Sequence, residues 1–350
     1  MTHPVEPNGL EPASLPDFIR TFRKVQAEVH KAIVGQEQAV EQLLTAFFAG
    51  GHVLIEGVPG TGKTTLVKTL GLALNLSFNR IQFTVDLMPA DITGTRVILS
   101  GADGHREFSF QPGPIFCHLL LGDEINRATP KTQSALLEAM AELQVTSGGT
   151  TYPLAPPYFV MATLNPIEME GTYPLPEAQL DRFLLKVRLA YPNEDDMVRI
   201  IAATTGAQES PIEPVFSAAT AAREVERLKR LVREVMVAPA VERYAARMVR
   251  ATQPENSRAL GELKSPIHID AVSRYVLFGS SPRGAQALIL CGKVRALLDG
   301  RANVDFDDLD ELAPAALEHR IMLNYAAHSD NIEPAQIIAE VVKTVRRTRD

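Results

Sequence analysis

The sequence predicts an α/β fold, in which a parallel five-stranded sheet lies between helices and a smaller all-helical domain follows. Three observations support this class. A glycine-rich segment at 57–64 stands between a short apolar run and a helical segment. Two further apolar runs, at 115–121 and 157–164, lead into polar residues, as buried parallel strands do at a ligand-binding edge. After about residue 190 no strand signal stands out and helical patterns dominate.

The segment GVPGTGKTTL at 57–66 is typical of a loop that binds phosphates. An apolar run, 53–55, precedes it as a strand, and leucines spaced four apart follow it as a helix. The glycines let successive N–H groups point at phosphate oxygens, at a helix N-terminus that favours anions. Lys63 would reach the β- and γ-phosphates, and the Thr64 hydroxyl would bind Mg²⁺. The residues expected to hold the nucleotide here are Gly57, Pro59, Gly60, Thr61, Gly62, Lys63, Thr64 and Thr65.

Two acids follow the apolar run 115–121. Asp123 and Glu124 are expected at the carboxyl end of that strand, where ligands bind in open α/β sheets. Asp123 is the candidate partner of Mg²⁺, reached through water, and Glu124 is placed to polarise the water that attacks the γ-phosphate. A switch GTPase would often lack this second acid and use a glutamine, so the pair favours steady ATP turnover.

Three more polar residues could meet a phosphate. Asn165 ends the strand expected at 157–166; it could bind the attacking water or only shape an Asn-Pro turn. Arg182 could pair within the helix of Asp181, or project into a neighbouring subunit's nucleotide. Arg283 lies in the first turn of a helix that Ser281 would cap. A cation there opposes the helix dipole, which suggests that it serves a phosphate.

Composition narrows the class of protein. The chain has 350 residues, 45% of them hydrophobic, which is enough for two domains. Its net charge of −7 argues against nucleic acid as a partner. No apolar run is long enough to span a bilayer, and the polar N-terminus does not resemble a signal peptide. Cys117 and Cys291 are too few for a disulfide framework and lack CxxC spacing, which favours a reducing cytoplasm.

Longer phrases of the sequence resemble the MoxR family of AAA+ ATPases. They are IVGQEQAVEQLLTAFFAGGHVLIEGVPGTGKTTLVKTL, QFTVDLMPADITGT, FQPGPIF, LLLGDEINRATPKTQSALLEAMAELQVT, ATLNPIEMEGTYPLPEAQLDRF and SPRGAQALI. The resemblance covers about residues 20 to 345. It implies that Lys63 and Thr64 are the Walker A pair, Asp123 and Glu124 the Walker B pair, Asn165 sensor 1, Arg182 the arginine finger (with Arg127 as second candidate), Arg283 sensor 2, and Val34, Gly35 and Gln36 neighbours of the adenine.

The resemblance also implies a domain plan. Residues 1–14 would be a flexible tail, 15–190 the αβα nucleotide-binding core, and 191–350 a linker and helical lid. Within the core, about 86–112 would form the helix-2 insert and 143–158 the hairpin before sensor 1. Both are expected to face a central pore or a partner.

The expected ligands and partners follow from the same family. They are ATP and Mg²⁺, a ring of six identical chains, and a client or adaptor protein that often carries a von Willebrand factor A domain. A ring makes chemical sense, because the site lacks a second cation against the γ-phosphate and a neighbour must supply one.

Three alternative functions use much of the same core. A DNA translocase or helicase loader needs basic pore loops, and the insert carries Arg96 and Arg106 against several acids. A magnesium-chelatase-like motor subunit differs mainly in its partner, which the sequence does not specify. A nucleotide switch without hydrolysis is disfavoured by Glu124.

Overall fold

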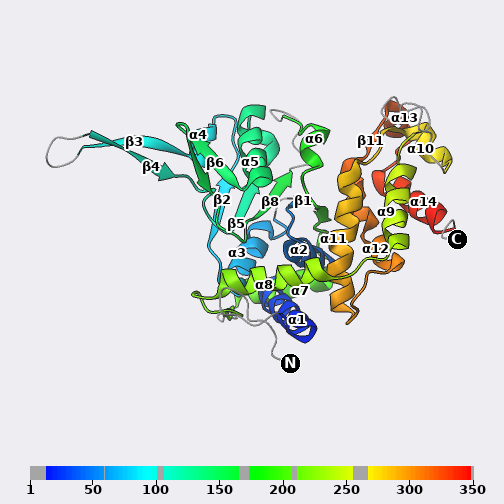
Figure 1. Cartoon of the computed structure of the whole chain (residues 1–350), viewed down its shortest axis with the longest axis horizontal. Helices are drawn as coiled ribbons and strands as arrows, with labels where there is room; N and C mark the ends of the chain where they lie inside the picture. The colour runs from blue at the N-terminus through cyan, green and yellow to red at the C-terminus, as the bar shows by residue number, and fades with distance from the viewer. Residues whose placement is uncertain are drawn as a thin grey trace.

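The structure, a computed structural model, describes residues 13–58, 60–100, 106–164, 173–206, 211–254 and 267–347. A layered α/β core comes first along the chain (Figure 1). Its elements are α1 (Leu15–Ala32), α2 (Glu37–Ala49), β1 (Val53–Glu56), α3 (Lys63–Leu74), β2 (Phe78–Gln82), α4 (Pro89–Thr93), β3 (Gly94–Ser100), β4 (Arg106–Pro112), β5 (Leu119–Asp123), η1 (Ile125–Arg127), α5 (Pro130–Glu142), β6 (Gln144–Ser147), β7 (Thr150–Pro153), β8 (Phe159–Leu164), α6 (Glu177–Leu180) and β9 (Leu185–Arg188).

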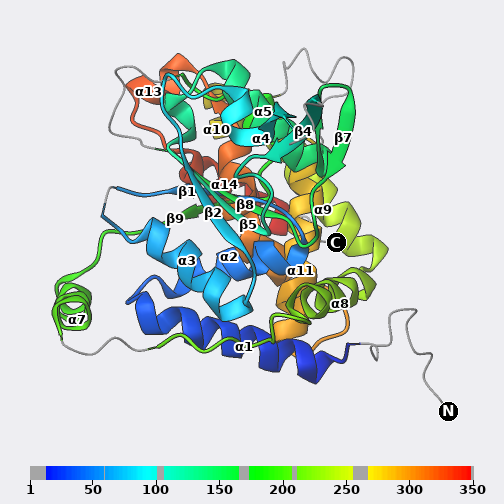
Figure 2. The same ribbon diagram turned by 90° about the vertical axis from the view of Figure 1, so that its left-hand side faces the viewer.

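A mostly helical part follows, with α11 and α12 beside the core (Figure 1). Its elements are α7 (Glu194–Thr205), α8 (Ala221–Glu234), α9 (Pro239–Ala251), α10 (Asp270–Tyr275), β10 (Val276–Phe278), α11 (Pro282–Leu298), α12 (Phe306–Leu317), η3 (Glu318–Arg320), β11 (Met322–Leu323), α13 (Tyr325–Ser329) and α14 (Pro334–Arg346). In Figure 2, α7 lies apart from the other helices, at the end of the segment that connects it to β9.

The five-stranded sheet has the order β2-β5-β8-β1-β9, and all its neighbouring strands are parallel. Alternate residues of each strand face opposite sides. Val53 and Ile55 of β1 join an apolar cluster with α1, α2 and α3, whereas Leu54 joins a second cluster with α5. The predicted class, a parallel five-stranded sheet between helices followed by a lid, is confirmed. All carboxyl ends of the strands therefore meet at one edge.

Local sequence signals account for several helix starts. The Asn193 side chain accepts the Asp196 N–H at 2.8 Å and caps α7. The Ser281 hydroxyl accepts the Arg283 N–H at 3.1 Å, with Pro282 at the first helical position of α11. Such caps satisfy N–H groups that have no partner within the helix. The N-cap predicted at Ser281 is confirmed.

Two local predictions were wrong. The strand expected at 115–121 begins only at Leu119 and ends at Asp123; Ile115 and Cys117 are buried in the turn before it. Burial of an apolar run does not by itself require strand backbone. The lid is also not purely helical, because β10 pairs antiparallel with β11. These strands have three and two residues, too few to give a periodic signal.

Two hairpins project from the core beside α5 (Figure 1). One is β3–β4, which pairs Gly94 with Pro112 at its base, and the other is β6–β7. They contact each other: Phe110 stacks on Tyr152 with ring centroids 3.9 Å apart, and Arg96 Nη1 donates to the Gly148 carbonyl at 3.1 Å. The insert and the second hairpin thus form one projecting unit. Within the described residues, no helix is both long and apolar enough to cross a membrane.

Candidate functional site: a nucleotide pocket at the carboxyl edge of the sheet

The phosphate-binding loop connects β1 to α3. Gly60 and Gly62 have φ angles of +84° and +83°, which favour glycine, and α3 begins directly after them with Lys63. Lys63 Nζ donates to the Gly57 carbonyl at 2.7 Å, so the ammonium folds back over the loop. This geometry leaves the N–H groups of the first turn of α3 for an anion. Pro59, also expected here, lies outside the described residues.

A cavity of about 210 Å³ adjoins this loop. Of the residues expected to hold the nucleotide, six line it: Val34, Gln36, Gly60, Thr61, Gly62 and Thr65. The second domain contributes residues that the sequence analysis missed: Pro192 precedes α7, and Ile200 and Thr204 lie one turn apart on it. The full lining is Ala32, Ile33, Val34, Gln36, Gly60, Thr61, Gly62, Thr65, Pro192, Ile200 and Thr204.

The loop before α2 forms hydrogen bonds with the segment between β9 and α7. Gln36 Nε2 donates to the Ala190 carbonyl at 2.6 Å, and its Oε1 accepts the Ala190 N–H at 3.1 Å. Gly35 has φ +66°, and a Cβ there would lie 2.8 Å from the Asp196 carboxylate. The left-handed backbone favours glycine at this position, whereas the Asp196 carboxylate, at the end of a flexible side chain, could move aside.

Asp123 ends β5 and is 7% exposed. Its Oδ1 accepts from the Thr163 hydroxyl at 2.6 Å, and its Oδ2 accepts from Arg80 Nη2 at 2.7 Å. Thr163 is fully buried on β8, and Arg80 lies on β2, so the two strands that flank β5 orient the carboxylate. Neither residue was predicted to belong to the site. A polar residue inside an apolar strand, such as Thr163, is the signal that could have found it.

Glu124 follows Asp123 in a left-handed conformation, with φ +57°. Its N–H donates to the Thr163 hydroxyl at 2.8 Å. Its Oε2 accepts from Gln82 Nε2 at 3.1 Å and pairs with Arg127 Nε at 2.9 Å. Non-glycine residues rarely take this conformation, and those that do cluster at functional sites. The carboxylate is thus held by Gln82 of β2 and Arg127 of η1, and the backbone of Glu124 by Thr163 of β8.

Of the three remaining predicted residues, the structure describes Arg182 and Arg283. Asn165 lies outside the described residues, directly after β8. Arg182 is exposed and Nη1 donates to the Leu137 carbonyl at 2.6 Å. Arg283 Nη1 lies 3.7 Å from the Asp181 carboxylate. Neither arginine lines the cavity beside the phosphate loop.

The side chains fit Mg²⁺ only as part of a nucleotide complex. Among the described residues, no three His, Cys, Asp or Glu side chains gather as a set of metal ligands. Mg²⁺ is usually bound by one or two protein oxygens together with substrate phosphates. Thr64, in the first turn of α3, and Asp123 can supply those oxygens from two elements of the same sheet edge.

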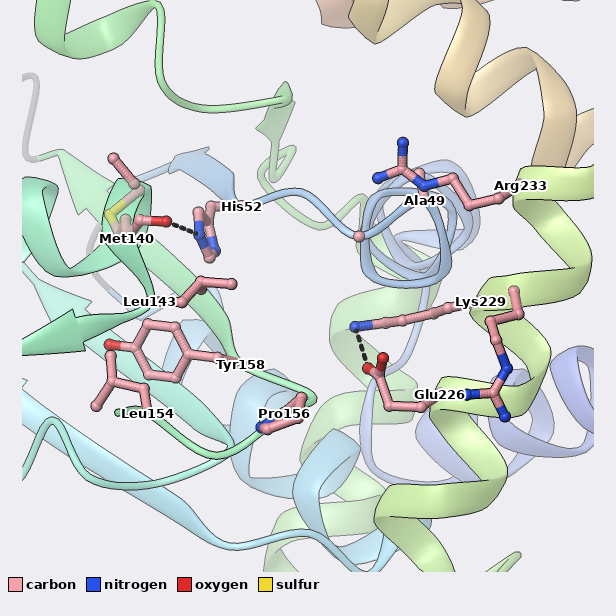
Figure 3. Close-up of a pocket in the computed structure, with 13 residues that line it drawn as sticks. Ala49, His52, Met140, Leu143, Leu154, Pro156, Tyr158, Glu226, Lys229 and Arg233 are labelled. Carbon is pink, nitrogen blue, oxygen red and sulfur yellow. Dashed lines mark hydrogen bonds and ion pairs between the residues drawn. The ribbon is translucent and has the colours of Figure 1, made fainter. Parts of the chain in front are cut away.

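A larger cavity of about 490 Å³ lies away from this edge (Figure 3). His52, Met140 and Tyr158 line one side, and Lys229 projects toward it from α8, with Glu226 at 3.4 Å. Lys229 also lies 4.9 Å from the centroid of the Phe47 ring. None of the residues expected to bind nucleotide lines this cavity.

His52, in the wall of this cavity, gives a prediction for stability against pH. Nδ1 accepts the Val160 N–H at 3.1 Å and Nε2 lies 3.2 Å from the Met140 carbonyl, which fits the neutral ring. Burial lowers the pKa of His52 from 6.5 to about 4. The unfolded chain therefore takes up a proton first as the pH falls. This one group should lower the free energy of unfolding by about 3 kcal/mol between pH 6.5 and pH 4.

The measurement is urea unfolding at pH 7 and pH 4.5 for the parent and for His52→Gln. A glutamine keeps one donor and one acceptor but does not titrate. The variant should lose less stability than the parent on acidification. An equal loss in both would show that His52 does not contribute to the pH dependence.

Comparison with known proteins agrees with the geometry. Residues 52–185 match the family described as ATPases associated with various cellular activities (AAA), and residues 270–341 match the AAA lid domain. The Chaperone MoxR1 of Mycobacterium tuberculosis is 40% identical over 98% of this chain and 86% of its own length. The Protein MoxR of Methylorubrum extorquens is 30% identical over 97% and 98%. A crystal structure of a candidate ATPase from Cytophaga hutchinsonii superposes with a TM-score of 0.82, at 37% identity over 94% and 96%.

A phosphate-binding loop on a sheet of this order, followed by a helical lid, defines the AAA+ class of ATPases. Within that class, the chain belongs to the MoxR family, as the extended phrases of its sequence indicated.

Proposed function

We propose that this chain binds and hydrolyses ATP with Mg²⁺ in a ring of identical copies, and uses the cycle to remodel or activate a partner protein. The observation that carries the proposal is the placement of Glu124. Its carboxylate is held by Gln82 and Arg127 directly after Asp123, at the sheet edge that also carries the phosphate loop. Neighbouring strands are about 4.8 Å apart. The loop after β1 and the acids after β5 are two strands apart, which a triphosphate can span.

Each residue then has a defined task. The N–H groups around Gly60 and Gly62, with Lys63, would hold the β- and γ-phosphates. Thr64 and Asp123 would hold Mg²⁺, which neutralises charge on the phosphate oxygens when bound. Glu124 would orient the attacking water and accept its proton.

The ring is proposed because the two arginines that the structure describes beside the acids are already paired. Arg80 is paired with Asp123, and Arg127 with Glu124. Lys63 is the cation of the loop itself. Charge that develops on the γ-phosphate during hydrolysis calls for a further cation, and Arg182 is exposed on the chain's surface. We infer that a neighbouring chain supplies it, in a ring that is typically hexameric in this family.

The partner is proposed to be a protein. The Mycobacterium tuberculosis relative is named a chaperone, and in this family partners often carry a von Willebrand factor A domain. On the β3–β4 hairpin, Ile98 and Phe108 lie directly opposite each other and are 55% and 66% exposed. Arg96 lies 4.9 Å from the Phe108 ring centroid. An exposed apolar pair on a projecting hairpin is suited to contact a client polypeptide.

Lys63→Ala tests the nucleotide site. Charge-assisted hydrogen bonds contribute about 1.5–3 kcal/mol each, so removing this ammonium should abolish ATP binding at micromolar ATP. The measurement is titration with a fluorescent ATP analogue. Lys68→Ala, an exposed position on the same helix, is the matched control and should bind normally. Affinity within a few-fold of the parent in the Lys63 variant would remove the loop from nucleotide binding.

A further inference from the structure

Arg320, on η3 of the lid, fixes the segment of the core that contains Arg182. The Arg320 side chain is 2% exposed. Its hydrogen bonds run from Nε to the Asp181 carboxylate (3.0 Å), from Nη1 to the carbonyls of Leu184 (3.0 Å) and Ala316, and from Nη2 to the carbonyls of Asp181 (3.3 Å) and Phe183 (2.6 Å). A guanidinium has five N–H donors. All five are used, and four of them bind residues that flank Arg182.

Asp181 receives a second contact from the lid. Its carboxylate accepts from the Ser281 hydroxyl at 2.8 Å and lies 3.7 Å from Arg283 Nη1. Ser281 caps α11 with the same hydroxyl. The residue next to Arg182 is therefore held both by the start of α11 and by η3. This also accounts for a cation in the first turn of α11, since Asp181 lies beside it.

The η3 segment also contacts the other end of β9. Glu318 Oε2 pairs with Arg188 Nη2 at 3.0 Å, and Arg188 Nε lies 3.2 Å from Glu56 Oε2. Glu56 ends β1, directly before the phosphate loop. One lid segment thus contacts both the residues around Arg182 and a charge network that reaches the nucleotide loop of the same chain.

We propose that Arg320 and Asp181 are positioning residues that set where Arg182 is presented to the neighbouring chain, so that the lid of one chain controls hydrolysis in the next. The inference rests on the proposed action of Arg182 across the ring. The Arg182 side chain has one hydrogen bond within the described residues, to the Leu137 carbonyl. The backbone on either side of it is instead fixed by Arg320, so a lid that shifts would carry the arginine with it. Misplacement of a reacting group by about 1 Å can cost about a hundredfold in rate.

The test introduces Arg320→Lys into only one of the two kinds of chain in a mixed ring. Lys63→Ala chains, whose own site is empty, are mixed with Arg182→Ala chains, whose site is intact, and the recovered ATPase rate is measured. Arg320→Lys keeps the charge but replaces the planar five-donor group. Added to the Lys63→Ala chain, which donates the arginine, it should reduce the recovered rate tenfold or more. Added to the Arg182→Ala chain, it should leave the recovery within about twofold.

A difference between the two placements distinguishes a role of Arg320 in positioning Arg182 from a general role in folding. Equal losses in both placements, or no loss in either, would overturn the inference while leaving the proposed function in place. No recovery in the parent mixture, with mixed rings present, would overturn both. Arg301→Lys is the matched control: this lid arginine binds Asp308 and Asp299 and has no part in the contacts around Arg182. If Arg320→Lys does not fold, Asp181→Asn, which keeps the size of the side chain, is read in the same way.

Discussion

The Glu124→Gln chain should bind ATP as tightly as the parent and hydrolyse it on the order of a hundredfold more slowly. A glutamine preserves the length of the side chain, and its oxygen can still accept from Gln82 and Arg127. The Thr163 hydroxyl can still accept the backbone N–H of residue 124. What the amide cannot do is accept a proton from water. Binding and hydrolysis should therefore separate, which is measured by ATP affinity and by steady-state phosphate release.

Glu138→Gln is the matched control, because this glutamate is exposed on α5. It should hydrolyse ATP at the parent rate. Parent-like turnover in Glu124→Gln would remove this acid from the mechanism, and loss of binding would mean that the change disturbs the site. The same variant, held in its ATP-bound state, is the best reagent for isolating the client protein.

The site elements that could be predicted from sequence are those with local signals. Gly60 and Gly62 required particular backbone angles, and Lys63 and Thr64 followed at fixed spacing. Asn193 and Ser281 are N-caps, whose signal is the residue type at one position. Asp123 and Glu124 were selected because they directly follow an apolar run, and the family phrases agreed with that interpretation. Each of these features depends on residues within a few positions of one another.

The parts that could not be predicted depend on strand order. Arg80 and Gln82 reach the acids only because β2 pairs with β5, and Thr163 does so because β8 lies on the other side. No spacing along the chain encodes those neighbours. The cavity wall from α7 was missed for a different reason: Ile200 looks like any apolar residue of an amphipathic helix. The buried turn at Ile115 and Cys117 was taken for a strand because both are apolar.

The contacts around Arg182 also could not be predicted from the sequence. The sequence left two possibilities for this arginine: a local pair with Asp181's helix, or action in a neighbouring site. In the structure Asp181 is occupied by Arg320, Ser281 and Arg283 instead. The local ion pair is thus not what holds Arg182, and its exposed position favours the second possibility.

The Arg182→Ala chain should keep nearly normal ATP affinity and lose hydrolysis. Neither Arg182 nor its neighbours line the cavity beside the phosphate loop, so binding has no reason to change. An arginine supplied from another chain stabilises charge in the transition state, which in the best-studied phosphoryl-transfer enzymes is worth roughly 10³- to 10⁵-fold in rate. The only side-chain hydrogen bond lost within the described part of the chain is the one to the Leu137 carbonyl. A general loss of stability should therefore be small, which a thermal melt checks.

Mixing distinguishes action across the ring from action within the chain. Arg182→Ala and Lys63→Ala chains should each be nearly inactive, and their mixture should recover part of the parent rate. Recovery should rise with protein concentration, because it requires assembly. Arg127 is the other candidate, but it pairs with Glu124 of its own chain at 2.9 Å. An inactive mixture in which mixed rings are present would exclude Arg182 as the residue that acts in trans. Arg127→Ala, paired with Lys63→Ala in the same way, would then be the variant expected to show recovery.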